Sequence, residues 1–144
     1  MKIIESQSAV LTNYEVWQHL VAQKQRYHCS KRRGPANLET VVREVLSWMR
    51  TRPGPLAQEP ATYSNECIAQ LLERLRRYTL SKGEVLVILN LRPTSVVALN
   101  TIVDDLGERF SEEQQEEIVA MIVEVLGQFE QDQGTDHAMD TAAG

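Results

Sequence analysis

The sequence predicts an all-α protein, a helical bundle preceded by an extended N-terminal segment. Three observations support this fold class. Apolar residues recur at the three- and four-residue spacing of amphipathic helices in several segments. Three stretches carry a serine or threonine followed three residues later by glutamate or glutamine, a pattern that caps helix starts. No strand-like alternation occurs after residue 11. We therefore expect about six helices in one domain.

Composition narrows the function classes. A chain of 144 residues with 42% hydrophobic and 24% charged residues is ordinary for one folded soluble domain. The net charge of −5 argues against a nucleic-acid-binding protein, although residues 1–52 hold nine Lys or Arg and only four Asp or Glu. A solvated surface with an acidic tail explains this asymmetry most simply, and two faces with different partners are the alternative. Two cysteines, no long apolar run and no secretory signal indicate an intracellular protein without a membrane span.

The N-terminal residues 3–11, IIESQSAVL, contain β-branched and apolar residues without a helical period. An extended segment needs partners for its backbone donors and acceptors. It either lies across the helices, or another chain supplies the neighbouring strand. Thr12 and Glu15 then form a capping box, and the first helix is expected to run to about Tyr27.

The middle of the chain predicts two further helices. The first covers residues 38–49, with apolar residues stepping at helical spacing and Asn37 as its expected N-cap. A proline-rich connector at residues 51–60 follows, and residues 68–75 form the next helix.

Capping and helix-breaking residues mark the ends of the last helices. Ser81 opens a capping box, and the helix that follows ends at Pro93. The next helix is expected to continue from residue 96 to residue 106, with Gly107 as its left-handed stop. Ser111 opens the last capping box, and its helix is expected to end near Phe129. The expected organisation is an N-terminal segment (1–11), a helical domain (12–129) and a disordered acidic tail (130–144).

No catalytic or metal-binding constellation is found. The three histidines are scattered and lack a nucleophile motif, and the glycines occur singly. The carboxylates of residues 112–117 suit the positive end of a helix better than a metal site. We expect neither an enzyme nor a bound cofactor.

Two local features suggest binding. The basic stretch KQRYHCSKRR at residues 24–33 offers Lys31, Arg32 and Arg33 for phosphates, beside an aromatic ring for stacking. Such composition is also common in ordinary loops. Tyr14 and Trp17, next to the unpaired segment, form either a partner-docking surface or part of the core.

Several motifs resemble a known family. Leu80-Ser81-x-x-Glu84 and Leu89-Asn90-x-x-Pro93-Thr94-Ser95 are similar to the HRDC-like domain of small RNA polymerase stalk subunits. Residues 11–16, LTNYEV, and residues 109–114, RFSEEQ, resemble the small stalk subunit family of RNA polymerase III, also called the calcitonin gene-related peptide receptor component protein family. The resemblance covers about residues 8–128. The basic loop and the proline-rich connector match it poorly, and Val87 and Leu91 are more apolar than its pattern.

This resemblance implies a non-catalytic, nuclear subunit of DNA-directed RNA polymerase III. Such subunits form a heterodimer with a larger stalk subunit, built from a tip domain and an oligonucleotide-binding (OB-fold) barrel. The heterodimer supports transcription initiation at tRNA and 5S rRNA genes. Expected partners are this larger subunit, the polymerase core and initiation factors, with only indirect contact to nucleic acid and none to membranes.

The resemblance also assigns roles to residues. Arg92, expected in an exposed turn, would face initiation factors. Two alternatives stay open: a free-standing HRDC-type nucleic-acid-binding module acting through Lys31, Arg32 and Arg33, and the equivalent stalk subunit of RNA polymerase II. The expected heterodimer contacts are Val10, Leu11, Asn13, Tyr14, Val16 and Trp17.

Overall fold

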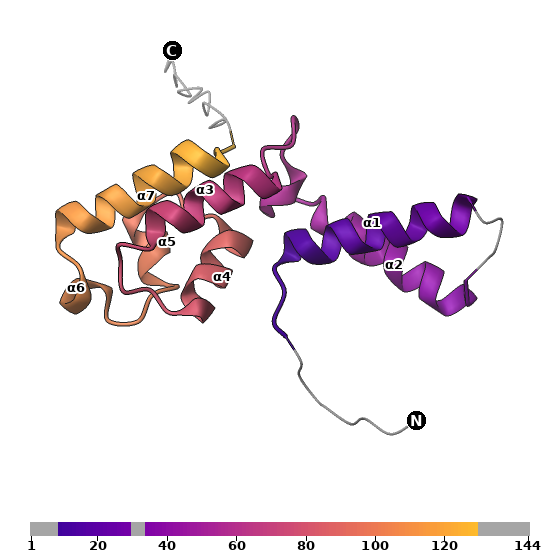
Figure 1. The fold of residues 1–144 in the computed structure, drawn as a ribbon, viewed down its shortest axis with the longest axis horizontal. Helices are drawn as coiled ribbons and strands as arrows, with labels where there is room; N and C mark the ends of the chain where they lie inside the picture. Colours follow the sequence, from indigo (N-terminus) through magenta and orange to yellow (C-terminus); the bar gives the residue numbers. More distant parts are fainter. Residues whose placement is uncertain (1–8, 30–33, 130–144) are drawn as a thin grey trace, which may run out of the picture.

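The computed structural model describes residues 9–29 and 34–129, and within these ranges every regular element is helical (Figure 1). The predicted all-α fold is therefore confirmed. The calls on residues 1–8, on Lys31, Arg32 and Arg33, and on residues 130–144 fall outside the described residues. The elements in chain order are α1 (Asn13–Cys29), α2 (Ala36–Met49), the 3-10 helix η1 (Pro55–Ala57), α3 (Asn65–Leu75), α4 (Lys82–Leu91), α5 (Val96–Asn100), α6 (Leu106–Arg109) and α7 (Glu112–Leu126).

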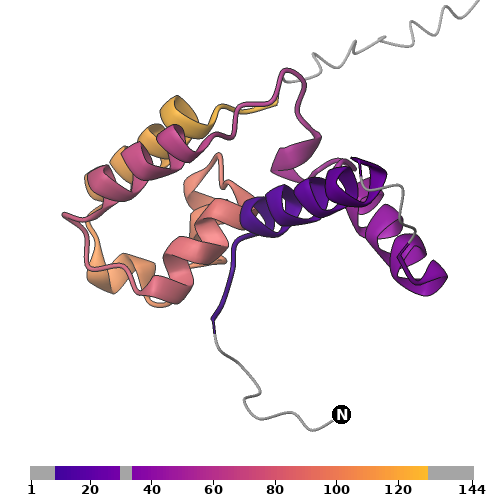
Figure 2. The same ribbon diagram turned by 45° about the vertical axis from the view of Figure 1, so that its right-hand side comes forward.

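The helices form two parts that meet at the start of α1 (Figures 1 and 2). Helices α1 and α2 pack against each other as a hairpin. Helices α3 to α7 form the body, in which α3 lies alongside α7 and α5 also packs against α7. In both views the start of α1 lies near the end of α4. The junction between the two parts therefore involves segments far apart in sequence.

The body contains most of the hydrophobic core. Each fully buried aliphatic side chain contributes about 1.5–3 kcal/mol relative to an exposed one. No helix among the described residues is long and apolar enough to cross a membrane. The side chains with essentially no exposed area are Leu71, Ile88, Leu99, Val103, Leu106, Ile118, Ile122 and Leu126.

Local capping explains most helix starts. The boxes predicted at Thr12, Ser81 and Ser111 are present, and each hydroxyl accepts the backbone N–H three residues ahead. Helix α3 has a further box that the sequence did not reveal, between Ser64 and Cys67. There the thiol sulfur accepts the Ser64 N–H at 3.1 Å, a role normally played by a carboxylate or amide.

The start of α2 differs from expectation. Its N-cap is Pro35, whose backbone φ of −54° suits the entry to a helix, so Asn37 lies within the first turn and is not the cap. The Gly34 N–H instead donates to Glu39 Oε1 at 3.0 Å. The Glu39 side chain, inside the helix, thus binds the residue that precedes the N-cap.

The predicted continuous helix over residues 96–106 is wrong. Helix α5 ends at Asn100, and α6 begins at Leu106. Asp105 takes the left-handed conformation, with φ of 52°, that was expected for Gly107. Gly107 instead lies inside α6.

Tighter hydrogen bonding accounts for this break. The Thr101 N–H donates to a carbonyl three residues back, as does the Ile102 N–H. Val103, which lies in this turn, and Leu106, which begins α6, are 1% and 2% exposed and so enter the same core. Burial of these two side chains outweighs the helical regularity that the spacing predicted.

Candidate partner-binding surface

Two apolar side chains just before α1, those of Val10 and Leu11, are 52% and 53% exposed. Thr12 is buried, and its backbone N–H donates to Glu15 Oε2 at 2.7 Å. That bond, with a second one from the Thr12 hydroxyl, lowers the pKa of the Glu15 carboxyl. The start of α1 is therefore held firmly, and it presents Val10 and Leu11 to solvent.

A hydrogen bond joins this helix start to the body. The Asn13 backbone N–H donates to Asn90 Oδ1 at 2.8 Å. First-turn N–H groups have no partner inside their own helix, so Asn90, near the end of α4, caps α1. The Asn90 side chain thereby ties the hairpin to the body.

An aromatic cluster lies behind the first turn of α1. Tyr14 is buried, with its ring 6.0 Å from the rings of both Trp17 and Tyr63. The Tyr14 hydroxyl accepts from Gln18 Nε2 at 2.9 Å. The Tyr63 hydroxyl donates to the Leu89 carbonyl at 2.8 Å, and burial raises the pKa of that phenol. These contacts direct Tyr14 inward.

The structure thus separates the six expected partner contacts by exposure. Val10 and Leu11 point to solvent, whereas Tyr14 belongs to the core. Asn13, Val16 and Trp17 are half-buried, and Trp17 packs against the core cluster.

A second apolar surface lies on α2, and the sequence did not identify it as a surface. Met49 is the only buried residue of this helix. Leu38, Val41 and Trp48 are 40%, 55% and 66% exposed, and their spacing places them along one helix face. We call these three residues the α2 stripe. Residues 9–29 and 34–129 supply no core that covers this face of the helix.

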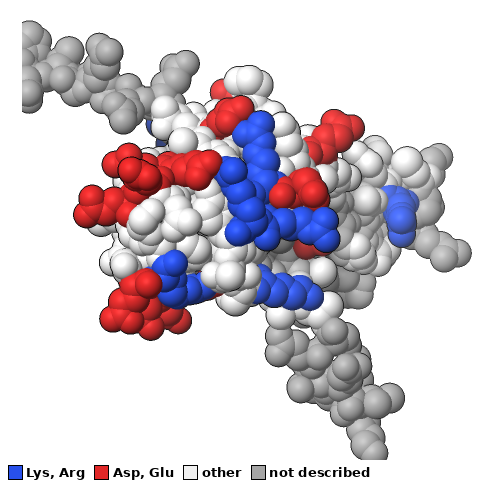
Figure 3. Space-filling view, turned by 60° about the vertical axis from the view of Figure 1, so that its left-hand side comes forward, with Lys and Arg blue, Asp and Glu red and all other residues white. Residues whose placement is uncertain are grey.

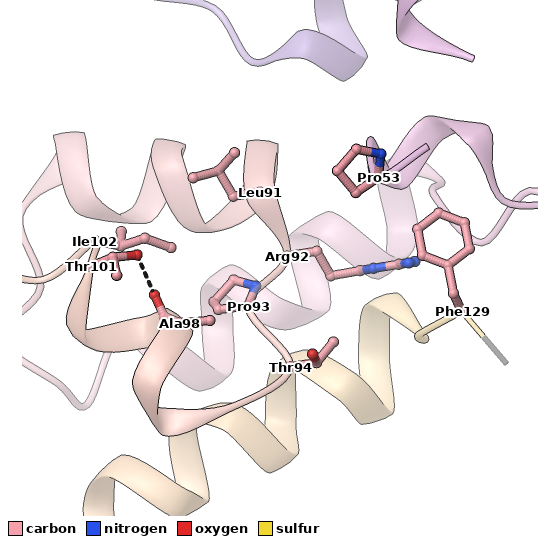
Figure 4. Close-up of a pocket in the computed structure, with 9 residues that line it drawn as sticks. All are labelled: Pro53, Leu91, Arg92, Pro93, Thr94, Ala98, Thr101, Ile102 and Phe129. Carbon is pink, nitrogen blue, oxygen red and sulfur yellow. Dashed lines mark hydrogen bonds between the residues drawn. The ribbon is translucent and has the colours of Figure 1, made fainter. Parts of the chain in front are cut away.

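Arg92 does not lie in an exposed turn, and that expectation is wrong. The residue is 4% exposed and takes the left-handed conformation, with φ of 50°. Its Nη1 donates to Gln58 Oε1 and to the Leu126 carbonyl, and its guanidinium lies 4.7 Å from the centre of the Phe129 ring (Figure 4). Burial lowers the pKa of Arg92. The side chain links the end of α4 to the end of α7.

Comparison with known proteins decides the family. Residues 10–126 match the family model described as RNA polymerase Rpb4. The chain belongs to the RNA polymerase Rpb4 family.

Two relatives of this Rpb4-family chain are yeast proteins. DNA-directed RNA polymerase III subunit rpc9 of Schizosaccharomyces pombe is 33% identical over 120 residues, which cover 78% of this chain and 89% of the relative. DNA-directed RNA polymerase III subunit RPC9 of Saccharomyces cerevisiae is 27% identical over 157 aligned positions, which cover 85% and 98%. The resemblance to the RNA polymerase III small stalk subunit family is thereby confirmed.

Four described arginines of this Rpb4-family chain form ion pairs with carboxylates. On α3 and the turn after it, Arg74, Arg76 and Arg77 form ion pairs with Glu124, Glu73 and Glu117 respectively. Figure 3 accordingly shows Lys and Arg interleaved with Asp and Glu on this face. Paired guanidinium groups are less available to phosphates than unpaired ones.

The described part of this Rpb4-family chain offers no donor set for a metal ion. No group of three or more His, Cys, Asp or Glu side chains is placed to hold one among these residues. Cys67 serves the capping box of α3, and Cys29 is exposed at the end of α1.

Proposed function

We propose that this chain is a non-catalytic stalk subunit of RNA polymerase III that forms a heterodimer with the larger, OB-fold-containing stalk subunit. In this role it supports transcription initiation at tRNA and 5S rRNA genes and acts in the nucleus. Its direct partners are the larger stalk subunit and the polymerase core. Nucleic acid is contacted through these partners.

The observation that carries the proposal is the membership of the Rpb4 family, together with similarity to two RNA polymerase III subunits along most of each chain. Both relatives are named as subunits of DNA-directed RNA polymerase III. The assignment to polymerase III in preference to polymerase II rests on these two proteins.

Uncovered apolar surface supports an obligate partner. The side chains of Val10 and Leu11, just before α1, are exposed. The α2 stripe adds three large exposed side chains on the same hairpin. Contiguous exposed apolar surface on a soluble protein marks an interaction site. We propose that Val10 and Leu11 contact the larger stalk subunit directly, whereas Asn13, Tyr14, Val16 and Trp17 build the platform that holds them.

Copurification tests the assignment. The tagged chain is purified from cells, and the copurifying proteins are identified by mass spectrometry. The proposal predicts the larger stalk subunit of RNA polymerase III in a one-to-one complex, together with the polymerase core. Recovery of polymerase II subunits in their place, or of a monomer that ignores both polymerases, would overturn it.

Variants at the helix entry test the interface. Replacing Val10 and Leu11 together with Asp should lower recovery of the larger stalk subunit at least tenfold, because burying an unpaired carboxylate is costly. Both side chains are exposed, so the fold should be retained, as measured by circular dichroism. The matched control is Val97→Asp, at a site that is 79% exposed on α5, and its recovery should be unchanged. Equal recovery for all three chains would show that residues 10 and 11 are not in the interface.

A further inference from the structure

A cleft of about 290 Å³ lies between the end of α4, α5 and Phe129 (Figure 4). Leu91, Pro93, Ala98 and Ile102 give it mainly apolar walls. Among the residues that line it, Arg92 carries the only charge, and there is no carboxylate. The cleft therefore combines apolar surface with one positive group.

The charge of Arg92 is not neutralised within the described residues. Its contacts there are an amide oxygen, a backbone carbonyl and the Phe129 ring, and the ion pairs described for this part of the chain do not include it. A buried charge is normally paired, because removing it from water costs free energy that a countercharge offsets. Arg52 also lies against the Phe129 ring, at 4.9 Å from its centre. Because Arg92 has no countercharge among the described residues, the site favours an anion.

The geometry of Arg92 suits a carboxylate in particular. Both of its hydrogen bonds use Nη1, so Nε and Nη2 keep the donors of the planar fork that carboxylates bind in a bidentate manner. The Arg92 side chain also borders the cleft, between Pro53 and Phe129 (Figure 4).

The apolar residues of the cleft extend onto the open surface. Leu91 is 60% exposed, and Val97 on α5, next in sequence to the lining residue Ala98, is 79% exposed. A small inorganic anion leaves such residues in water, and a nucleic acid requires a track of several cations. A peptide that carries both an acidic and a bulky apolar side chain covers the apolar walls and neutralises Arg92 together.

We propose that this cleft binds an acidic peptide segment of another protein. One carboxylate of that segment pairs with Arg92, and an adjacent aliphatic or aromatic side chain covers Leu91 and the walls formed by Ala98 and Ile102. This site is additional to the heterodimer contacts at Val10 and Leu11, and its assignment does not depend on which polymerase the chain serves.

A peptide titration tests the site. The complete 144-residue chain, alone or in the complex in which it copurifies, is titrated with acetyl-DDELFDELDD-amide and observed by methyl NMR. We expect saturable shifts at the Ala98 and Ile102 methyl groups and an affinity that falls as salt rises. The uncharged probe acetyl-NNQLFNQLNN-amide should bind at least tenfold more weakly.

A matched pair of variants places the peptide on the cleft. Leu91→Glu adds a negative charge at an exposed position of the cleft, so it should weaken peptide binding at least tenfold without unfolding the chain. Leu72→Glu makes the same change on α3 at a side chain that is 41% exposed, and it should leave binding unchanged. Arg52→Gln should weaken binding less than Leu91→Glu does.

Three results would overturn the proposal: no saturable shift in the cleft, equal binding of the two probes, or equal effects of the two leucine variants. A fourth would reassign the occupant to the chain itself. If the acidic probe binds only when Glu130, Asp132, Asp136 and Asp140 are changed to their amides, the partner-peptide proposal is wrong. The titration requires no polymerase subunit, so a negative result would not contradict the assignment to RNA polymerase III. Failed copurification, in turn, would not contradict the peptide-binding cleft.

Discussion

Polar groups at the end of α4 hold other parts of the molecule in place. The Leu89 carbonyl accepts the Tyr63 hydroxyl, the Asn90 amide oxygen accepts the first-turn N–H of α1, and Arg92 binds the last carbonyl of α7. Each bond reaches a segment at least 26 residues away in sequence. Polar residues at the end of an otherwise apolar helix therefore act as ties between elements.

Asn90→Ala tests the tie to α1. The change removes the acceptor of the Asn13 N–H and leaves that donor without its bond, so the free energy of unfolding should fall by about 1 kcal/mol. Urea unfolding monitored by circular dichroism measures the difference. Asn100→Ala, at an exposed position at the end of α5, is the control and should change stability much less. Equal stability of the two variants would show that the Asn90 bond contributes nothing net.

At this scale the sequence predicts only what is local. The capping boxes at Thr12 and Ser81 involve partners three residues apart, so their residue types suffice to predict them. The partner of Asn90 lies 77 residues away, and Arg92 is buried by Gln58 and by the end of α7. No spacing rule reports such contacts, which is why Arg92 was wrongly expected to be exposed.

Helix α4 is connected to α6 by one ion pair. Arg109 donates to both oxygens of Glu84, the residue that completes the capping box, and also to the Thr79 and Asp104 carbonyls. The bond from Arg109, more than any other cause, lowers the pKa of Glu84 from an ordinary value of 4.5 to about 2. A carboxyl whose pKa is lower in the folded chain stabilises the fold only while it is ionised.

Glu84→Gln should reveal this dependence on pH. Gln resembles the protonated acid, so the wild-type chain should be more stable by about 1–2 kcal/mol at pH 7. This difference in the free energy of unfolding should be fully present above about pH 4.5 and should vanish as the pH falls toward 2. Urea unfolding of both chains at pH 7, 4.5 and 2.5 measures it. Glu108→Gln, at an exposed carboxylate that joins no ion pair of the described residues, is the control; a gap for Glu84→Gln that is independent of pH would contradict the assignment.

Element existence follows from periodicity, whereas element ends depend on tertiary packing. Helix α7 was predicted well because its capping residue, Ser111, and its apolar spacing agree. The break between α5 and α6 was missed because Val103 and Leu106 keep helical spacing in sequence. Their burial in one core requires a turn that the spacing does not encode.

At the scale of the whole molecule, most of the hydrophobic core lies in the body, whereas the apolar α2 stripe of the hairpin is exposed. In the body, apolar stripes meet one another around side chains such as Leu71 and Ile122. On the hairpin, the α2 stripe has the same amphipathic pattern but remains exposed. A sequence pattern shows that a face is apolar, but it does not show whether this chain or another covers that face. The proposed polymerase partner supplies a physical reason for the stripe.

Trp48 offers a direct test of whether the larger stalk subunit covers the α2 stripe. The chain has two tryptophans, so Trp17→Phe leaves Trp48 as the only one and keeps an aromatic ring against the core. Trp48 is 66% exposed, and its fluorescence should be readily quenched by acrylamide in the isolated chain. Binding of the larger subunit should shift its emission to shorter wavelength and reduce quenching severalfold, because the indole leaves water. The reciprocal Trp48→Phe chain reports Trp17, which is already half-buried and should change less. Unchanged quenching of Trp48 in a stable complex would show that this partner binds through residues 10 and 11 without covering α2.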